Sequence, residues 1–217
     1  LPHPPLPRRV RYAVELGVVA VLTALLLVFL PQHMRTTAVY LPLALIGLGL
    51  IGFTARETRE HIWGPPDSPS FDRVRRCAIN MTVLTVPPVL VFFIVGLVMG
   101  RLLNPNFFIA LCLYLPWALL QQTIFQFYLL GRLRAVLPFA SPLFLAIVNG
   151  VLYGLVHLPN VWVTLVTMIG GVFWSYSYHR DRYVLPIAIS HAVLGTTFYY
   201  WVLGQDLWRH MWQRLVM

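Results

Sequence analysis

Residues 107–130 decide the fold class: they read FFIALCLYLPWALLQQTIFQFYLL and contain no charged side chain. A spanning α-helix needs about 20 consecutive, predominantly apolar residues. The apolar residues here are continuous rather than alternating, which argues against a membrane β-strand. The stretch therefore predicts a transmembrane helix, and its three glutamines, Gln121, Gln122 and Gln126, are polar groups placed inside it.

The whole chain shares this apolar character. Of its 217 residues, 59% are hydrophobic and 11% are charged, whereas a soluble domain has about 25% charged residues. This composition excludes an ordinary soluble globule, a disordered chain and, despite the net charge of +9, a nucleic-acid-binding domain. We predict a multi-pass integral membrane protein whose general partners are membrane lipids, with no nucleic-acid partner.

Seven apolar stretches are long enough, or nearly so, to cross a bilayer. They cover residues 12–30, 37–55, 78–100, 107–130, 142–156, 161–178 and 184–203. The first is longer than a signal-peptide apolar region and lacks a small-x-small cleavage site, so we expect an uncleaved anchor. The sequence thus predicts an all-α, polytopic transmembrane helical bundle of about seven spans, with residues 1–217 forming a single integral membrane domain.

The charged residues predict the orientation. All sixteen basic residues are arginine, and an inside N-terminus would place twelve of them on the inner side. The positive-inside rule then favours a cytoplasmic N-terminus and an outside C-terminus, in a prokaryotic inner membrane. Glu15 is the only acid within an apolar stretch, and we expect it to pair with Arg11, one helical turn away.

Polar side chains recur at helical spacing in three of the stretches. The polar positions are Gln121, Gln122 and Gln126 in residues 107–130, Asn149, Tyr153 and His157 at the fifth stretch, and His191 with Gly195 in the seventh. Polar groups at this depth usually face a bundle interior or a wet cavity, and one common cavity would satisfy all three sets. The alternative is that these side chains form structural hydrogen bonds between helices and have no catalytic role, above all Asn149 and Ser190. For the two histidines a functional role is favoured, because the ring is titratable.

These residues also form three short motifs in a characteristic order. They are Gln121-Gln122-Thr-Ile-Phe-Gln126 followed by Arg132, Tyr153-Gly-Leu-Val-His157, and Ser190-His191-Ala-Val-Leu-Gly195. In order and spacing they resemble the Glu-Glu-x-x-x-Arg, Phe-x-x-x-His and His-x-x-x-Asn motifs of the CAAX protease and bacteriocin-processing family, which contains the type II CAAX prenyl endopeptidases. The resemblance covers residues 107–203, the C-terminal half, and implies a CAAX-protease-like core there.

The resemblance implies roles for individual residues. Gln121 and Gln122 take the places of the two glutamates, of which the first activates water together with the first histidine, here His157. His191 takes the place of the oxyanion donor. Gly195 replaces the asparagine and Gln126 replaces the arginine of the first motif. Because a glutamine amide cannot act as a general base near neutral pH, we expect His157 to be the base and Gln121 to orient the water.

The sequence leaves three functions open. The first is a CAAX-protease-like intramembrane hydrolase acting on an apolar, lipidated or prenylated peptide, with His157, His191, Gln121 and Gln122 as catalytic residues. Gln126, Asn149, Tyr153 and Gly195 would line its cavity. The second is a non-hydrolytic enzyme that acts on an isoprenoid or lipid in the same cavity, and the third is an inactive membrane scaffold or immunity protein. Two histidines are too few for a protein zinc site, so we expect no metal and no cofactor.

Overall fold

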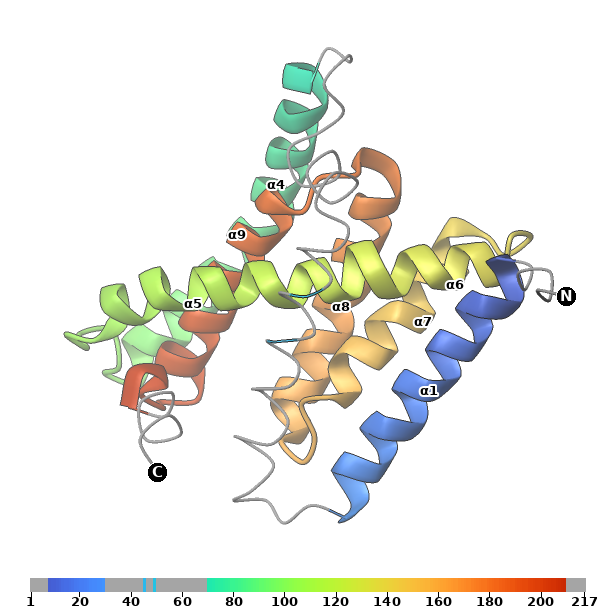
Figure 1. The fold of residues 1–217 in the computed structure, drawn as a ribbon. Helices are drawn as coiled ribbons and strands as arrows, with labels where there is room; N and C mark the ends of the chain where they lie inside the picture. Colours follow the sequence, from blue (N-terminus) through green and yellow to red (C-terminus); the bar gives the residue numbers. More distant parts are fainter. Residues whose placement is uncertain (1–7, 30–44, 46–48, 50–69, 210–217) are drawn as a thin grey trace, which may run out of the picture. The chain divides into compact units, whose positions relative to one another are not determined.

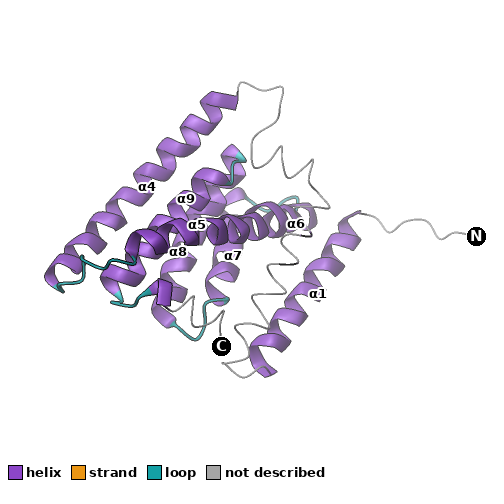
Figure 2. Cartoon of the chain, turned by 60° about the vertical axis from the view of Figure 1, so that its left-hand side comes forward, coloured by secondary structure: helices purple, strands orange, loops and turns teal. Residues whose placement is uncertain are grey.

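The computed structural model describes residues 8–29, 45, 49 and 70–209. Helices and their connecting loops make up these residues, which contain no β-strand (Figure 2). Three of the helices, Phe71–Val98, Phe107–Val136 and Val161–Asp181, are long and apolar enough to cross a membrane. The fold class is therefore confirmed as an all-α membrane protein.

The helices follow the predicted stretches closely. They are α1 (Arg8–Phe29), α4 (Ser70–Val98), α5 (Phe107–Gln122), η1 (Thr123–Leu129), α6 (Leu130–Val136), α7 (Pro142–Leu155), α8 (Val161–Asp181), α9 (Leu185–Thr197) and η2 (Phe198–Val202) (Figure 1). The expected stretch 37–55 lies outside the described residues apart from Leu45 and Gly49. Residues 107–130 extend through α6 as one continuous helix that ends at Val136.

Two segments, η1 and η2, are π-helices where the sequence predicted regular α-helix. η1 begins directly after Gln122 and contains Gln126. A π-helix closes its hydrogen bonds over five residues instead of four, so it rotates the following side chains relative to those before it. The α-helical spacing that assigned Gln122 and Gln126 to one face therefore does not apply across this junction, although both side chains are buried.

The described helices form two compact units, each described here by itself. The first comprises Leu1–Ile46 and Ile124–Ser175, and the second comprises Gly47–Thr123 and Tyr176–Met217. Unit 1 thus holds α1, α6, α7 and most of α8, and unit 2 holds α4, α5, α9 and η2. The single-domain organisation inferred from the sequence stays a prediction.

In unit 1, α7 and α8 cross at glycines. A Cβ on Gly150 would lie 2.5 Å from Val172 N, and one on Gly171 would lie 2.9 Å from Gly150 Cα. A Cβ on Gly154, one turn further along α7, would lie 2.7 Å from Thr164 O. Gly150 and Gly154 form a small-x-x-x-small pair that lets two membrane helices approach closely. Ser141 caps the N-terminus of α7, because its Oγ accepts a hydrogen bond from Phe144 N–H at 3.2 Å.

The N-terminal helix of unit 1 is attached through charged groups. Glu15 pairs with Arg11 at 2.9 Å, as the sequence predicted, and also with Arg132 of α6 at 3.4 Å. The Arg132 guanidinium lies over the rings of Tyr12 and Tyr128, 4.9 and 4.5 Å from their centroids. α1 and α6 lie side by side in Figure 1 at this point. Arg132, which follows the first motif, therefore helps to hold α1 against α6.

In unit 2, α9 packs against both α5 and α4. The buried residues of α5 recur every four positions, at Ala110, Tyr114, Ala118 and Gln122. This spacing places them on one helical face, and the two alanines let the neighbouring backbone come close. Side chains on the outer surface of α4, such as Val83, Leu90 and Ile94, are largely exposed and apolar, as a lipid-facing helix requires.

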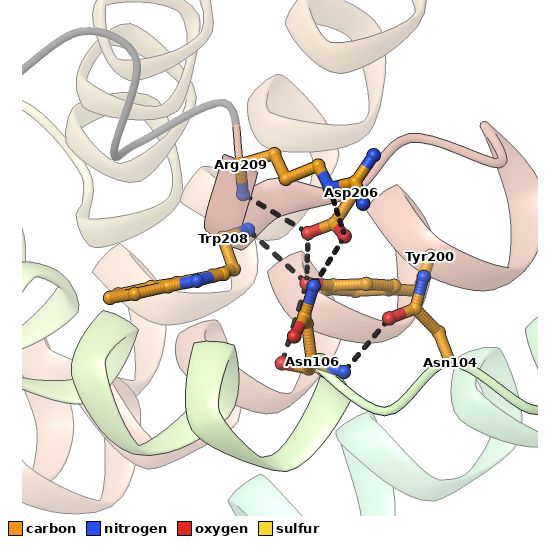
Figure 3. A network of polar contacts seen from close by, with 6 residues as sticks. All are labelled: Asn104, Asn106, Tyr200, Asp206, Trp208 and Arg209. Carbon is orange, nitrogen blue, oxygen red and sulfur yellow. Dashed lines mark hydrogen bonds and ion pairs between the residues drawn. The ribbon is translucent and has the colours of Figure 1, made fainter.

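The end of η2 is held by a network around Asp206 (Figure 3). Its carboxylate accepts hydrogen bonds from Asn106 Nδ2 at 2.7 Å, Tyr200 Oη at 2.8 Å and Arg209 N at 3.1 Å. Tyr200 Oη in turn accepts a bond from Trp208 N–H at 3.2 Å. Burial tends to raise the pKa of the Asp206 carboxyl, but the bonds from Asn106, Arg209 and Tyr200 outweigh it and hold the pKa below its usual value. The network joins the N-terminus of α5 to the segment that follows η2.

We predict that Gly150→Ala destabilises the protein by about 1–3 kcal/mol, because the added methyl meets the backbone of α8. Gly131→Ala is the matched control, since a Cβ there meets nothing within 4 Å, and alanine favours a helix over glycine by about 1 kcal/mol. Thermal unfolding of both variants in the same detergent is the measurement. Equal melting temperatures would contradict the close crossing of α7 and α8.

We also predict that acid weakens the Asp206 network. A carboxyl whose pKa is lowered by folding stabilises the protein above its usual pKa of 3.8, and this contribution is lost as the pH falls towards the lowered value. Asp206→Asn should therefore lower the melting temperature at pH 7, by the equivalent of about 1–2 kcal/mol, and the difference from the wild type should shrink as the pH falls below 3.8. Asp72→Asn, an exposed acid on α4, controls for net charge. A pH-independent difference would contradict the role of the carboxylate.

Candidate functional site

Unit 1 contains a buried hydrogen-bond network of amide and hydroxyl side chains. Asn149 Nδ2 donates to Ser175 Oγ at 2.8 Å and to Gln126 Oε1 at 3.3 Å. Ser175 Oγ donates to Gly171 O at 2.6 Å, so its only hydrogen is committed and it must accept from Asn149. The predicted cavity residues Gln126 and Asn149 are thus in direct contact, and all three side chains are fully buried.

Two acceptors in this unit are buried without a partner. Asn149 Oδ1 and Thr164 Oγ1 make no hydrogen bond within the described residues. Asn149 Oδ1 is an acceptor, so it would need a donor from outside the described residues. An unmade hydrogen bond at a buried group costs about 1–3 kcal/mol.

His157 lies two residues beyond the end of α7, not on the helix where four-residue spacing from Asn149 and Tyr153 placed it. Its Nδ1 is 3.0 Å from Tyr153 O. A carbonyl oxygen only accepts hydrogen bonds, so Nδ1 carries the proton and the neutral ring has its lone pair on Nε2. Burial lowers the pKa of His157, and the backbone contacts with Tyr153 and Gly154 oppose this only in part. Burial therefore favours the neutral form of this ring.

Tyr153 is part of an aromatic core rather than a free cavity wall. Its side chain is completely buried. Its ring centroid lies 4.4 Å from that of Phe125 and 5.7 Å from those of His157 and Trp174. Tyr153 therefore fixes the position of His157 in two ways, by its backbone carbonyl and by its ring.

Unit 2 holds the second histidine. His191 on α9 has its Nε2 3.1 Å from Tyr114 Oη on α5, and the two rings meet edge to face at 78°. A Cβ on Gly195, one turn along α9, would lie 2.7 Å from Tyr114 Cε1. The structure thus brings the predicted residues His191 and Gly195 together around Tyr114, which the sequence did not single out.

The two neighbouring glutamines of unit 2 differ in their surroundings. Gln122 is fully buried on the face of α5 that also carries Tyr114. Gln121 is partly buried, and its Oε1 has no hydrogen-bond partner among the described residues. A free amide oxygen is an acceptor that could orient a water molecule, which is the role expected of Gln121.

An apolar groove of about 500 Å³ lies on unit 2 between α4 and α9, which run side by side in Figure 2. Its lining includes Met81, Val86, Ile189 and Val193. Thr85 Oγ1 and Ser190 Oγ, also in the lining, are hydrogen-bonded at 2.7 Å. Ser190 lines the groove, whereas His191, the next residue on α9, does not. The Thr85 contact is the interhelical bond that the alternative reading of Ser190 predicted.

The site residues are divided between the units, and a single cavity shared by all of them stays a prediction. Within the described residues there is no cluster of three His, Cys, Asp or Glu side chains that could hold a metal. Sequence reasoning missed Ser175, Tyr114 and the glycine pair of α7. The four-residue recurrence of Ala110, Tyr114 and Ala118, and the spacing of Gly150 and Gly154, were signals that could have found two of these.

Residues 103–197 match the family model described as type II CAAX prenyl endopeptidase Rce1-like. The match covers slightly less than half of the chain and contains all three motifs. This segment is therefore an Rce1-like region, and the resemblance to the CAAX protease and bacteriocin-processing family is confirmed. Comparison with curated proteins and with solved structures gave no match.

We predict that Thr85 and Ser190 are coupled energetically. In a double-mutant cycle of Thr85→Val and Ser190→Ala, the coupling should be about 0.6–1.7 kcal/mol, the range for hydrogen bonds between membrane helices. Reversible unfolding in detergent measures it. The pair Thr82 and Ser190 provides a control cycle, since Thr82 bonds to its own helix at Ala78 O. A coupling of zero between Thr85 and Ser190 would contradict the interhelical bond.

Proposed function

We propose that the protein is a CAAX-protease-like intramembrane hydrolase that cleaves an apolar, membrane-embedded peptide, with a lipidated or prenylated peptide as the expected substrate. The observation that carries the proposal is the state of His157. It lies in the Rce1-like region, and its Nδ1–H bond to Tyr153 O leaves the lone pair on Nε2. A histidine in this state can accept a proton from water without the missing glutamate.

The proposed reaction follows from these groups. Gln121 Oε1 accepts a hydrogen bond from the water and orients it, and the water oxygen attacks the peptide carbonyl carbon. One water proton passes to His157 Nε2 while the carbonyl π electrons move to oxygen, which His191 stabilises. When the C–N bond breaks, the amine takes the proton from His157 and the carbonyl re-forms. Gln122, Gln126, Asn149 and Gly195 shape the neutral surroundings.

The apolar groove between α4 and α9 supports an apolar substrate. Its lining is predominantly hydrophobic and includes Ser190, the residue before His191 on α9. An acyl or prenyl chain in the bilayer is already out of water, so its contacts with the groove would add van der Waals packing rather than hydrophobic free energy. The membrane would deliver such a chain laterally. The orientation with the N-terminus inside a prokaryotic inner membrane belongs to the same proposal.

A non-catalytic scaffold is the second candidate, because several polar side chains already have protein partners. Asn149 bonds to Gln126 and Ser175, and Ser190 bonds to Thr85. In a scaffold these bonds would be structural, and substitution of the histidines would change stability alone.

The test is cleavage of a farnesylated peptide and of its unmodified counterpart by the purified protein in nanodiscs, followed by mass spectrometry. We expect the wild type to cleave the farnesylated peptide and His157→Ala to lose about 10²–10⁴-fold in rate, the usual contribution of a general base. His179→Ala, a histidine with no assigned role, should retain activity. Gln121→Glu should cleave faster than the wild type, because it supplies a carboxylate base.

Intact peptide after long incubation with both the wild type and Gln121→Glu would overturn the hydrolase proposal. A His157→Ala variant that is as active as His179→Ala would overturn the role of His157. Melting temperatures of all variants separate loss of chemistry from loss of folding.

A further inference from the structure

Three arginines gather around a surface hollow of about 580 Å³ near the N-terminal end of α4 in unit 2. The lining of this arginine hollow consists of Asp72, Arg73, Arg75, Arg76 and Ile79. Among the described residues, none of these three guanidinium groups takes part in an ion pair. An arginine without a carboxylate partner can bind a phosphate group through two parallel hydrogen bonds. The hollow therefore offers several such donors to an anion.

The length of α4 places these arginines at the level of the lipid headgroups. The candidate span Phe71–Val98 has 28 residues, which corresponds to about 42 Å of helix. The hydrocarbon core of a bilayer is only about 30 Å thick, so the ends of this helix extend beyond it. Side chains in a helix lean towards its N-terminus, and long basic side chains reach for the interface. The arginines of the first two turns can therefore meet lipid phosphates.

The apolar groove between α4 and α9 shares these first turns of α4 with the arginine hollow. On α4 the lining of the groove runs from Val74 to Val86, about 18 Å along the helix axis. Arg75 precedes Ala78 by three residues and Thr82 by seven, and both of these residues line the groove. This spacing places all three on one helical face. An arginine of the hollow thus lies at the N-terminal end of the groove.

The groove wall is apolar even where it carries hydroxyl groups. Thr82 Oγ1 donates a hydrogen bond to Ala78 O at 2.9 Å, and Thr85 Oγ1 is hydrogen-bonded to Ser190 Oγ at 2.7 Å. These hydroxyls are engaged within the protein, and most of the remaining lining is aliphatic. Such a wall suits a hydrocarbon chain better than a polar ligand.

We propose that the arginine hollow and the groove together bind one anionic phospholipid. Its phosphate lies on Arg73, Arg75 and Arg76, and one of its acyl chains lies in the groove. The positive charge of the hollow selects an anionic headgroup, and the groove selects a ligand with a long chain. The lipid is then the resident occupant of the groove, which the chain of an apolar substrate must displace. This inference goes beyond the proposed hydrolase and requires no catalysis.

Native mass spectrometry of the purified full chain tests the headgroup. The protein is titrated with palmitoyl-oleoyl phosphatidylglycerol and with the zwitterionic phosphatidylcholine of the same chains. One basic side chain near an anionic membrane surface contributes about fivefold in affinity, so three should favour phosphatidylglycerol by about 10²-fold. Arg75→Gln should weaken phosphatidylglycerol binding about fivefold. Arg134→Gln, the matched control on an exposed arginine of α6, should leave it unchanged.

Ala78→Trp tests the groove, because the indole would fill the space next to Arg75 without changing the charge. This variant should lose phosphatidylglycerol binding. Val83→Trp is the matched control, since Val83 is an exposed residue of α4 outside the groove lining, and it should bind as the wild type does. Glycerol phosphate, which has the charge but no acyl chain, should not displace the lipid. Melting temperatures show whether each variant is folded.

Equal affinity of the wild type for the two lipids would overturn the proposal, as would an Arg75→Gln variant that binds phosphatidylglycerol as tightly as Arg134→Gln. Equal binding by folded Ala78→Trp and Val83→Trp, or displacement of the lipid by glycerol phosphate, would remove the acyl chain from the groove and overturn it as well. None of these measurements uses peptide cleavage. A protein that binds the lipid as expected but leaves the farnesylated peptide intact would therefore overturn the hydrolase proposal alone.

Discussion

A buried amide or hydroxyl in a membrane helix has no bulk water to bind, so it must find a partner on another helix. This constraint accounts for the interior of both units. Asn149 spans from Gln126 to Ser175, Thr85 meets Ser190, and His191 meets Tyr114. Among the described residues, Asn149 Oδ1 and Gln121 Oε1 do not meet this requirement.

Small residues make these contacts possible. Gly150 and Gly171 bring α7 and α8 within backbone contact, which places Asn149 beside Ser175. Gly195 plays a corresponding part in unit 2 by admitting the Tyr114 ring. A larger side chain at Gly150 would clash with the backbone of α8, and one at Gly195 would clash with the Tyr114 ring. Packing and site geometry thus depend on the same glycines.

The three motif glutamines suit this interior, because Gln122 and Gln126 are fully buried. A charged side chain buried at such a place without a partner would cost several kcal/mol. Three glutamines avoid that cost and keep hydrogen-bonding capacity. The charges that remain are near helix ends, as in the Arg11, Glu15 and Arg132 cluster and the Asp206 network.

Much of the fold could be predicted because hydrophobic length and helical spacing are local properties. Composition determined the membrane class, the apolar stretches determined the helices, and the motif order determined the Rce1-like region. The π-helical turns η1 and η2, the end of α7 before His157 and the contacts of Tyr114 and Ser175 were decided only by the tertiary structure. These features join residues up to 77 positions apart or break the α-helical period. Spacing along the chain carries no information on which helices meet. It could therefore point to His191 and Gly195, which lie on one helix, but not to Tyr114, which contacts both from another helix.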